Sequence, residues 1–244
     1  MKVAILLAYA VTMEAQITAT LNRMPNGVDE VTLRNDSAIA VVAFAVTAKQ
    51  FPRTDFASGA PVVFYSDPLI EPENKPLPAN EERTVMRIAT PRRSWEPDPN
   101  ARRVLEGTVV AAGVLADGTT TGDAALLTRL ILRRSNTLLA VETSIETLSE
   151  AGRRNIPRNQ LIEQFQKMAD SMNRWYVPVE QQVGREVYQS IMGRLLNLPP
   201  AEPGAAFPPA AFIASETASL NRRRVSLLES QPGLEDAVLV VSAH

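Results

Sequence analysis

The feature that most constrains the fold of this chain is a change of hydrophobic period within residues 113–123, GVLADGTTTGD. Before this segment, short apolar and β-branched runs alternate with turn residues, a pattern typical of a β-sandwich. After it, apolar residues recur every three or four positions, as they do in amphipathic helices. The sequence therefore predicts an α+β chain, with an antiparallel β-sandwich followed by a helical bundle.

The N-terminal half contains several strand candidates. Residues 39–48 (IAVVAFAVTA) are so apolar that they predict a central strand covered on both faces. Residues 34–37 (RNDS) predict a hairpin-type turn, because Asn, Asp and Ser bond their own backbone. The proline-rich residues 67–83 are expected to run over the surface. The remaining strands are expected at residues 17–21, 28–33, 61–65, 84–89 and 104–115.

The C-terminal half follows a helical period. Residues 119–123 (TTTGD) are suited to cap a helix, since their side-chain oxygens accept from free backbone N–H groups. A stripe then predicts a helix of about 28 residues that ends at Gly152. Further helices are expected at residues 161–175, 178–198 and 215–230. The stripe consists of Leu127, Ile131, Arg134, Leu138, Val141, Ile145 and Leu148.

Composition excludes several kinds of chemistry. The chain has no cysteine, which rules out disulfides, Cys-ligated metals and thiol catalysis. Its single histidine is His244, so a Ser-His-Asp triad or a His-rich metal site in the body of the protein is excluded. With 25 basic and 27 acidic residues there is no basic excess of the kind that nucleic-acid binding requires.

The first residues, MKVAILLAYAVTMEAQ, have the layout of a secretory signal peptide over residues 1–16. Their apolar run is too short to span a bilayer, for which about 20 residues are needed. A buried first strand is the alternative interpretation. We therefore expect a periplasmic or secreted protein, and otherwise a cytoplasmic one, without an integral membrane segment.

Two acidic groups are candidates for metal sites. Asp117, Thr119, Thr121 and Asp123 offer oxygens suited to calcium, but a calcium loop needs more carboxylates, so a turn with a helix cap is favoured. Residues Glu142, Glu146 and Glu150 line one helix face, but a di-iron site would require histidines within the bundle. A solvated face is the preferred interpretation of that row.

Three further groups are candidates for binding sites. Residues 92–95 (RRSW) with Arg102 and Arg103 mix cations with an aromatic ring, but nearby acids neutralise them, which favours a surface loop. Residues 222–224 (RRR) are fewer than a lipid-binding cluster contains. The spacing of Trp175 and Tyr176 with Met168 and Met172 favours core over a ligand groove. No catalytic, cofactor-binding or metal-binding residue, and hence no cofactor, is predicted.

The C-terminal residues 199–244 are expected to be a tail. It begins with a proline-rich linker, PPAEPGAAFPP, and includes the fourth helix. Residues 237–242 (AVLVVS) are apolar and β-like. Such a segment adds a strand to an open sheet edge, in this molecule or in another.

Two stretches resemble known proteins. Asn35-Asp36-Ser37 with its flanking strands resembles the small Ig-like modules of bacterial envelope proteins. Residues 113–134 (GVLADGTTTGDAALLTRLILRR) resemble a pattern in uncharacterised exported proteins of acidobacteria. The resemblance implies export and a two-part architecture, and no activity. The resulting expectation is a signal peptide at residues 1–16, an Ig-like β-sandwich at 17–118, a helical domain at 119–198 and the tail at 199–244.

These observations favour a non-catalytic, exported binding or assembly module that contacts another protein. Two alternatives stay open. One is a hydrolase-type enzyme that uses carboxylates in the cleft between the two halves. The other is a self-associating structural protein, a homo-oligomer whose partner is a second copy of itself.

Overall fold

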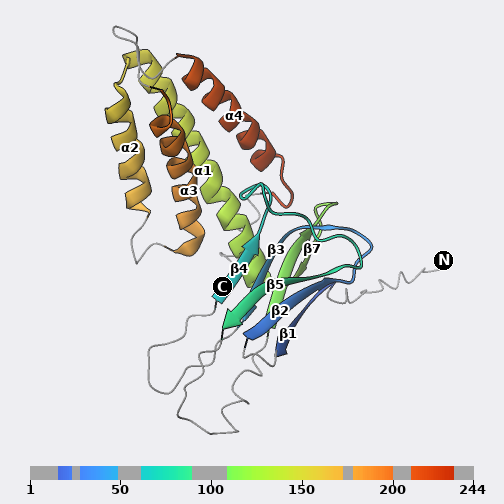
Figure 1. Cartoon of the computed structure of the whole chain (residues 1–244). Helices are drawn as coiled ribbons and strands as arrows, with labels where there is room; N and C mark the ends of the chain where they lie inside the picture. The colour runs from blue at the N-terminus through green and yellow to red at the C-terminus, as the bar shows by residue number, and fades with distance from the viewer. Residues whose placement is uncertain are drawn as a thin grey trace, which may run out of the picture.

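The computed structural model describes residues 16–23, 28–48, 62–89, 109–172, 178–199 and 210–233. Its N-terminal part consists of two antiparallel sheets and its C-terminal part of four helices, so the expected α+β class is confirmed (Figure 1). The predicted signal peptide and the loop at residues 92–103 lie outside the described residues, except for Gln16. Trp175, Tyr176 and residues 237–242 also lie outside them.

The two sheets contain three and four strands. The first sheet has the order β1 (Ile17–Arg23), β2 (Val28–Asn35), β5 (Glu82–Ala89). The second has the order β4 (Val62–Ser66), β3 (Val41–Ala48), β6 (Val109–Leu115), β7 (Thr120–Gly122). One apolar cluster is shared between the sheets, and its buried members are Ile17, Val31, Leu33, Val41, Phe44, Val46, Leu77, Ala111 and Leu115.

Strand β3 is a central strand, as its apolar sequence predicts. It pairs with β4 on one side and with β6 on the other. Phe44 and Val46 face the cluster between the sheets, while Ala45 faces a second cluster that is formed with the first helix. Both faces of β3 are therefore covered by protein.

The hairpin expected at residues 34–37 is wrong, because β2 and β3 belong to different sheets. The connection between them is fixed by Asn35, which is completely buried. Its side-chain amide donates to the carbonyls of Ile39 at 2.8 Å and Pro78 at 2.9 Å, and its side-chain oxygen accepts from the backbone N–H of Ser37 at 3.0 Å. The amide thus ties the crossover to the loop before β5.

Residues 67–83 are only partly a surface segment. Asp67, Ile70 and Leu77 are buried, so the surface prediction is wrong at these three positions. Leu77 forms an isolated antiparallel bridge with Val41 and enters the cluster between the sheets. The loop is therefore anchored at both ends, which fixes Asp67 in place.

The change of period is followed by one more strand before the first helix begins. β7 pairs with β6, so Thr120 and Thr121 belong to the sheet and not to the helix cap. Asp123 is the cap, because its side chain accepts from the N–H of Leu126 at 2.9 Å. The helix α1 (Ala124–Arg154) has 31 residues, slightly more than predicted.

Helix α1 connects the two parts of the molecule. Leu126 and Leu130, in its first turns, pack on Ala45, Tyr65 and Ala112 of the second sheet. Further along, α1 packs with α3 (Val179–Leu196) and α4 (Ala210–Leu228), and α2 (Arg158–Ser171) packs with α3; these helices lie beyond the sheets in Figure 1. All four helices contribute to one apolar cluster, in which Phe165 and Ile191 are fully buried. No helix within the described residues is long and apolar enough to cross a bilayer.

Candidate functional site

The most distinctive polar site lies where the sheets meet the helices, and it begins with the turn that follows β4. The backbone carbonyl of Asp67 accepts from the N–H groups of Ile70 at 2.9 Å and Glu71 at 2.8 Å. Its side-chain Oδ1 accepts from the N–H of Leu69 at 3.1 Å. These bonds close a tight turn, because an aspartate can satisfy the backbone of the residues that follow it. The carboxylate is thereby held facing α1.

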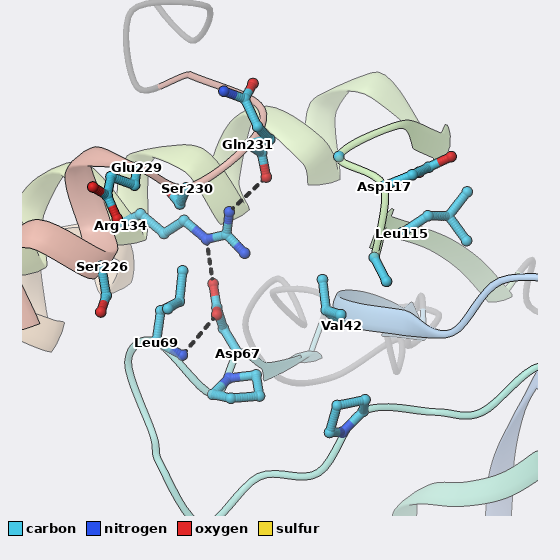
Figure 2. A pocket seen from close by; sticks show the side chains of 14 residues that line it. Val42, Asp67, Leu69, Leu115, Asp117, Arg134, Ser226, Glu229, Ser230 and Gln231 are labelled. Carbon is cyan, nitrogen blue, oxygen red and sulfur yellow. Dashed lines mark hydrogen bonds and ion pairs between the residues drawn. The ribbon is translucent and has the colours of Figure 1, made fainter.

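Asp67 forms a buried ion pair with Arg134 of α1. Arg134 Nε lies 2.6 Å from Asp67 Oδ2, and the two side chains are 3% and 1% exposed. Arg134 Nη1 donates to the backbone carbonyl of Gln231 at 3.0 Å, beyond the end of α4 (Figure 2). A single guanidinium therefore joins the loop after β4, helix α1 and the segment after α4.

A second set of contacts surrounds the neighbouring Arg133. Its Nη2 donates to Glu71 Oε1 at 2.8 Å, and its guanidinium lies 4.4 Å from the centre of the Tyr65 ring. The Tyr65 hydroxyl donates to Glu180 Oε1 of α3 at 2.9 Å. We call Tyr65, Asp67, Glu71, Arg133 and Arg134 the junction cluster, because together they hold sheet and helices in contact.

Burial alters the acid–base properties of this cluster. It raises the pKa of Tyr65 to about 12, with a further contribution from the negative charge of Glu180. Burial also raises the pKa of Glu71, although the positive charge of Arg133 opposes that effect. On α4, Arg223 donates to the carbonyl of Ile70 at 2.6 Å. A third arginine therefore binds the loop that follows β4.

The buried pair lines one side of a hollow of about 420 Å³, which is in the size range of ligand pockets (Figure 2). Three carboxylates line it. Asp67 is held by Arg134, and Asp117 accepts from the N–H and hydroxyl of Thr119 at 3.0 and 2.7 Å, which lowers the pKa of Asp117. Glu229 is exposed. Two of the three carboxylates are thus already engaged by the protein.

The acidic residues considered as a calcium loop do not converge. Asp117 and Thr119 form a turn with each other, and Thr121 accepts from the N–H of Gln16 at 3.1 Å. Asp123 caps α1. Among the described residues no group of three metal-ligating side chains is found. The oxygens of this segment therefore serve the strand ends and the helix start.

The other predicted groups are also separated by the fold. Glu142 pairs with Arg224 at 3.5 Å and Glu150 pairs with Arg153 and Arg154, while Glu146 is exposed. The three arginines at 222–224 point in different directions, since Arg223 donates a hydrogen bond to the loop after β4 and Arg222 is exposed. Met168 and Met172 pack against the helical cluster.

The junction cluster was not found from the sequence, although one signal was present. Arg134 occupies a position in the apolar stripe of α1, and a buried arginine requires a partner. Its partner, Asp67, lies in a segment expected to run over the surface. Comparison of the chain with family models, with curated proteins and with solved structures finds no match.

Replacing Tyr65 by phenylalanine is expected to cost about 1 kcal/mol near neutral pH, because one partly buried hydrogen bond is lost. The pKa of Tyr65 is raised in the folded state, so its contribution is present below pH 10 and is lost as the pH rises towards about 12. Urea unfolding of both proteins at increasing pH should show the difference shrinking over this window. A difference that does not change with pH would contradict the assignment.

Proposed function

We propose that this protein is a non-catalytic, exported binding module, and that it contacts an amphipathic helix of another protein through one patch on α1 and α4. The patch consists of Leu139, Val225 and Leu228, which are 58%, 49% and 52% exposed. Scattered exposed leucines are ordinary, but a group of them marks an interaction surface. The exposure of these three apolar side chains on two helices that pack together is the observation that carries the proposal.

The relative register of the two helices supports the grouping. Helix α4 runs antiparallel to α1, because Glu142 pairs with Arg224 while Arg134 bonds Gln231 further along. Leu139 lies three residues before Glu142 on α1, and Leu228 lies four residues after Arg224 on α4. Because the two helices are antiparallel, each leucine lies one helical turn from the Glu142–Arg224 pair in the same direction. Val225 is a neighbour of Leu228 at a spacing of three residues on α4.

The charges around the patch suit a helical partner. Glu142 and Arg224 lie at one end of the patch, Arg222 is exposed on α4, and Glu229 is exposed directly after α4. A patch with an apolar centre and both signs of charge around it matches an amphipathic helix, whose apolar stripe is flanked by charged residues.

We also propose that the two sheets form an Ig-like sandwich and the helices a bundle. In an Ig-like sandwich, the first, second and fifth strands share one sheet, and the third, sixth and seventh share the other. The orders β1-β2-β5 and β3-β6-β7 agree with that arrangement. The departure is β4, which lies beside β3 rather than β5.

The patch is tested by replacing Leu139 and Leu228 together with glutamine, which removes apolar surface and is compatible with a helix. The matched control is Leu196→Gln, an exposed leucine on α3. Crosslinking in the native cell should identify a partner, and the purified partner should bind the double variant at least about 10-fold more weakly than the wild type and the control. Equal binding by all three proteins would contradict the proposal.

Light scattering separates this proposal from self-association. A mass above the 26.6 kDa of one chain that falls to 26.6 kDa in the double variant would assign the patch to a second copy. Export has its own test, because mature protein should be recovered outside the cytoplasm without residues 1–16. Cytoplasmic protein that retains Met1 would contradict export.

A carboxylate hydrolase is the second candidate, and the hollow with Asp67, Asp117 and Glu229 is the observation that favours it. A screen of hydrolase and glycosidase substrates with the purified chain distinguishes it from the binding module. Turnover that is abolished by Glu229→Gln, in a variant that still folds, would favour the enzyme.

A further inference from the structure

Strand β4 is an edge of the second sheet, and one of its sides has no strand beside it among the described residues. Its side chains alternate between the two faces of the sheet. Val63 packs on the α1 side, and Phe64 packs towards the cluster between the sheets. Both side chains are only partly buried. An open edge of this kind is a template for another strand.

The contacts of Arg134 place the end of the described chain near the residue that follows β4, at the end of the sheet where Gln231 also lies against Gly118. Its guanidinium holds the carbonyl of Gln231 at 3.0 Å and the carboxylate of Asp67 at 2.6 Å. Asp67 directly follows Ser66, the last residue of β4. The chain therefore leaves Gly233 close to the C-terminal end of β4.

The sequence after Gly233 suits that position. Residues 234–236 (LED) provide a short connection, and four residue steps at roughly 3.3 Å each reach about 13 Å. The sequence of residues 237–242 (AVLVVS) is a largely apolar run, rich in β-branched residues and one residue longer than the five-residue β4. A run that is apolar at successive positions fits a strand covered on both faces, which is how β4 itself is placed.

We propose that residues 237–242 add a strand to the second sheet by pairing antiparallel with the open edge of β4. The antiparallel direction needs the shorter connection, because the described chain ends near the C-terminal end of β4. Pairing of Ala237 with Ser66 would place Val240 level with Val63. This inference does not depend on the proposed partner of the α1–α4 patch.

The pairing is tested in the full chain with pairs of cysteines, because the protein has none of its own. Val63→Cys is combined in turn with a cysteine at Val238, Leu239, Val240 or Val241. Side chains of a strand alternate between faces, so mild oxidation should form a disulfide within one chain at alternate positions only. The control pairs Thr20→Cys, on the edge strand β1 of the other sheet, with the same four positions, and should not crosslink.

Each result of this scan has a definite meaning. Crosslinks at alternate positions within the monomer support the proposal. Disulfides only between two chains would show that a second copy occupies the edge, and would overturn it. Equal crosslinking at all four positions, or none, would also overturn it, since neither is the behaviour of a paired strand.

A second measurement applies if the Val63→Cys variants do not fold. Val240→Pro is compared with Val240→Ala, because both substitutions change the side chain but only proline removes a backbone N–H and disrupts strand pairing. Hydrogen exchange of residues 62–66 should be at least about 10-fold faster in the proline variant than in the alanine variant. Equal exchange in the two variants would overturn the proposal.

Discussion

Replacing Asp67 by alanine is expected to destabilise the protein by about 3–5 kcal/mol, the largest effect that we predict for a single side chain. The reason is that the positive charge of Arg134 would remain without its partner. Arg134 would stay buried with its Nε facing no acceptor, and the turn after β4 would lose the bond to the N–H of Leu69. The free energy of unfolding in urea measures the effect.

Two further variants test whether the cost arises because the ion pair is buried. Arg153→Ala removes an exposed partner of Glu150, and its side chain is 73% exposed, so it should cost less than about 1 kcal/mol. Asp67→Leu combined with Arg134→Met removes both charges, and it should recover much of the stability lost in Asp67→Ala. A cost for Asp67→Ala as small as that for Arg153→Ala would show that the pair does not hold the junction.

Gly122→Ala is expected to destabilise the protein by about 3 kcal/mol, because the new Cβ cannot be accommodated. The residue has a φ of +94°, where side chains are strained, and an added Cβ would lie 2.2 Å from the backbone oxygen of Ala111. Neither atom can move without separating β7 from β6. Thermal or urea unfolding checks the prediction.

The matched control is another glycine. Gly193 lies within α3, and an added Cβ would meet nothing within 4 Å. Gly193→Ala should therefore stabilise the protein by about 0.5–1 kcal/mol, since alanine is the better helix former. If both substitutions changed stability in the same direction, the close approach at Gly122 would not be the cause.

The sequence predicted the elements better than the contacts between them. Local periodicity located six strands and the four helices, because a strand or a helix shows its buried face in the spacing of its own residues. β7 was missed because three residues are too few for a period, and its threonines resemble a helix cap. The expected hairpin after β2 failed because turn residues do not specify which sheet the next strand joins.

The contacts within the junction cluster could not be predicted from the sequence either. Asp67 and Arg134 are 67 residues apart, and neither sits in a motif. Their partnership depends on how the loop after β4 meets α1, which is a property of the tertiary structure. Asp123 was predicted correctly as a cap because its partner, Leu126, is only three residues away.

The length and placement of α1 have a consequence for motion. An unbroken helix of 31 residues extends for roughly 46 Å, and its first turns are packed into a sheet while the rest is packed among helices. No loop intervenes at which the two parts could turn. We expect sheets and helices to tumble as one body, so that amide relaxation reports a single rotational correlation time for strands and helices alike.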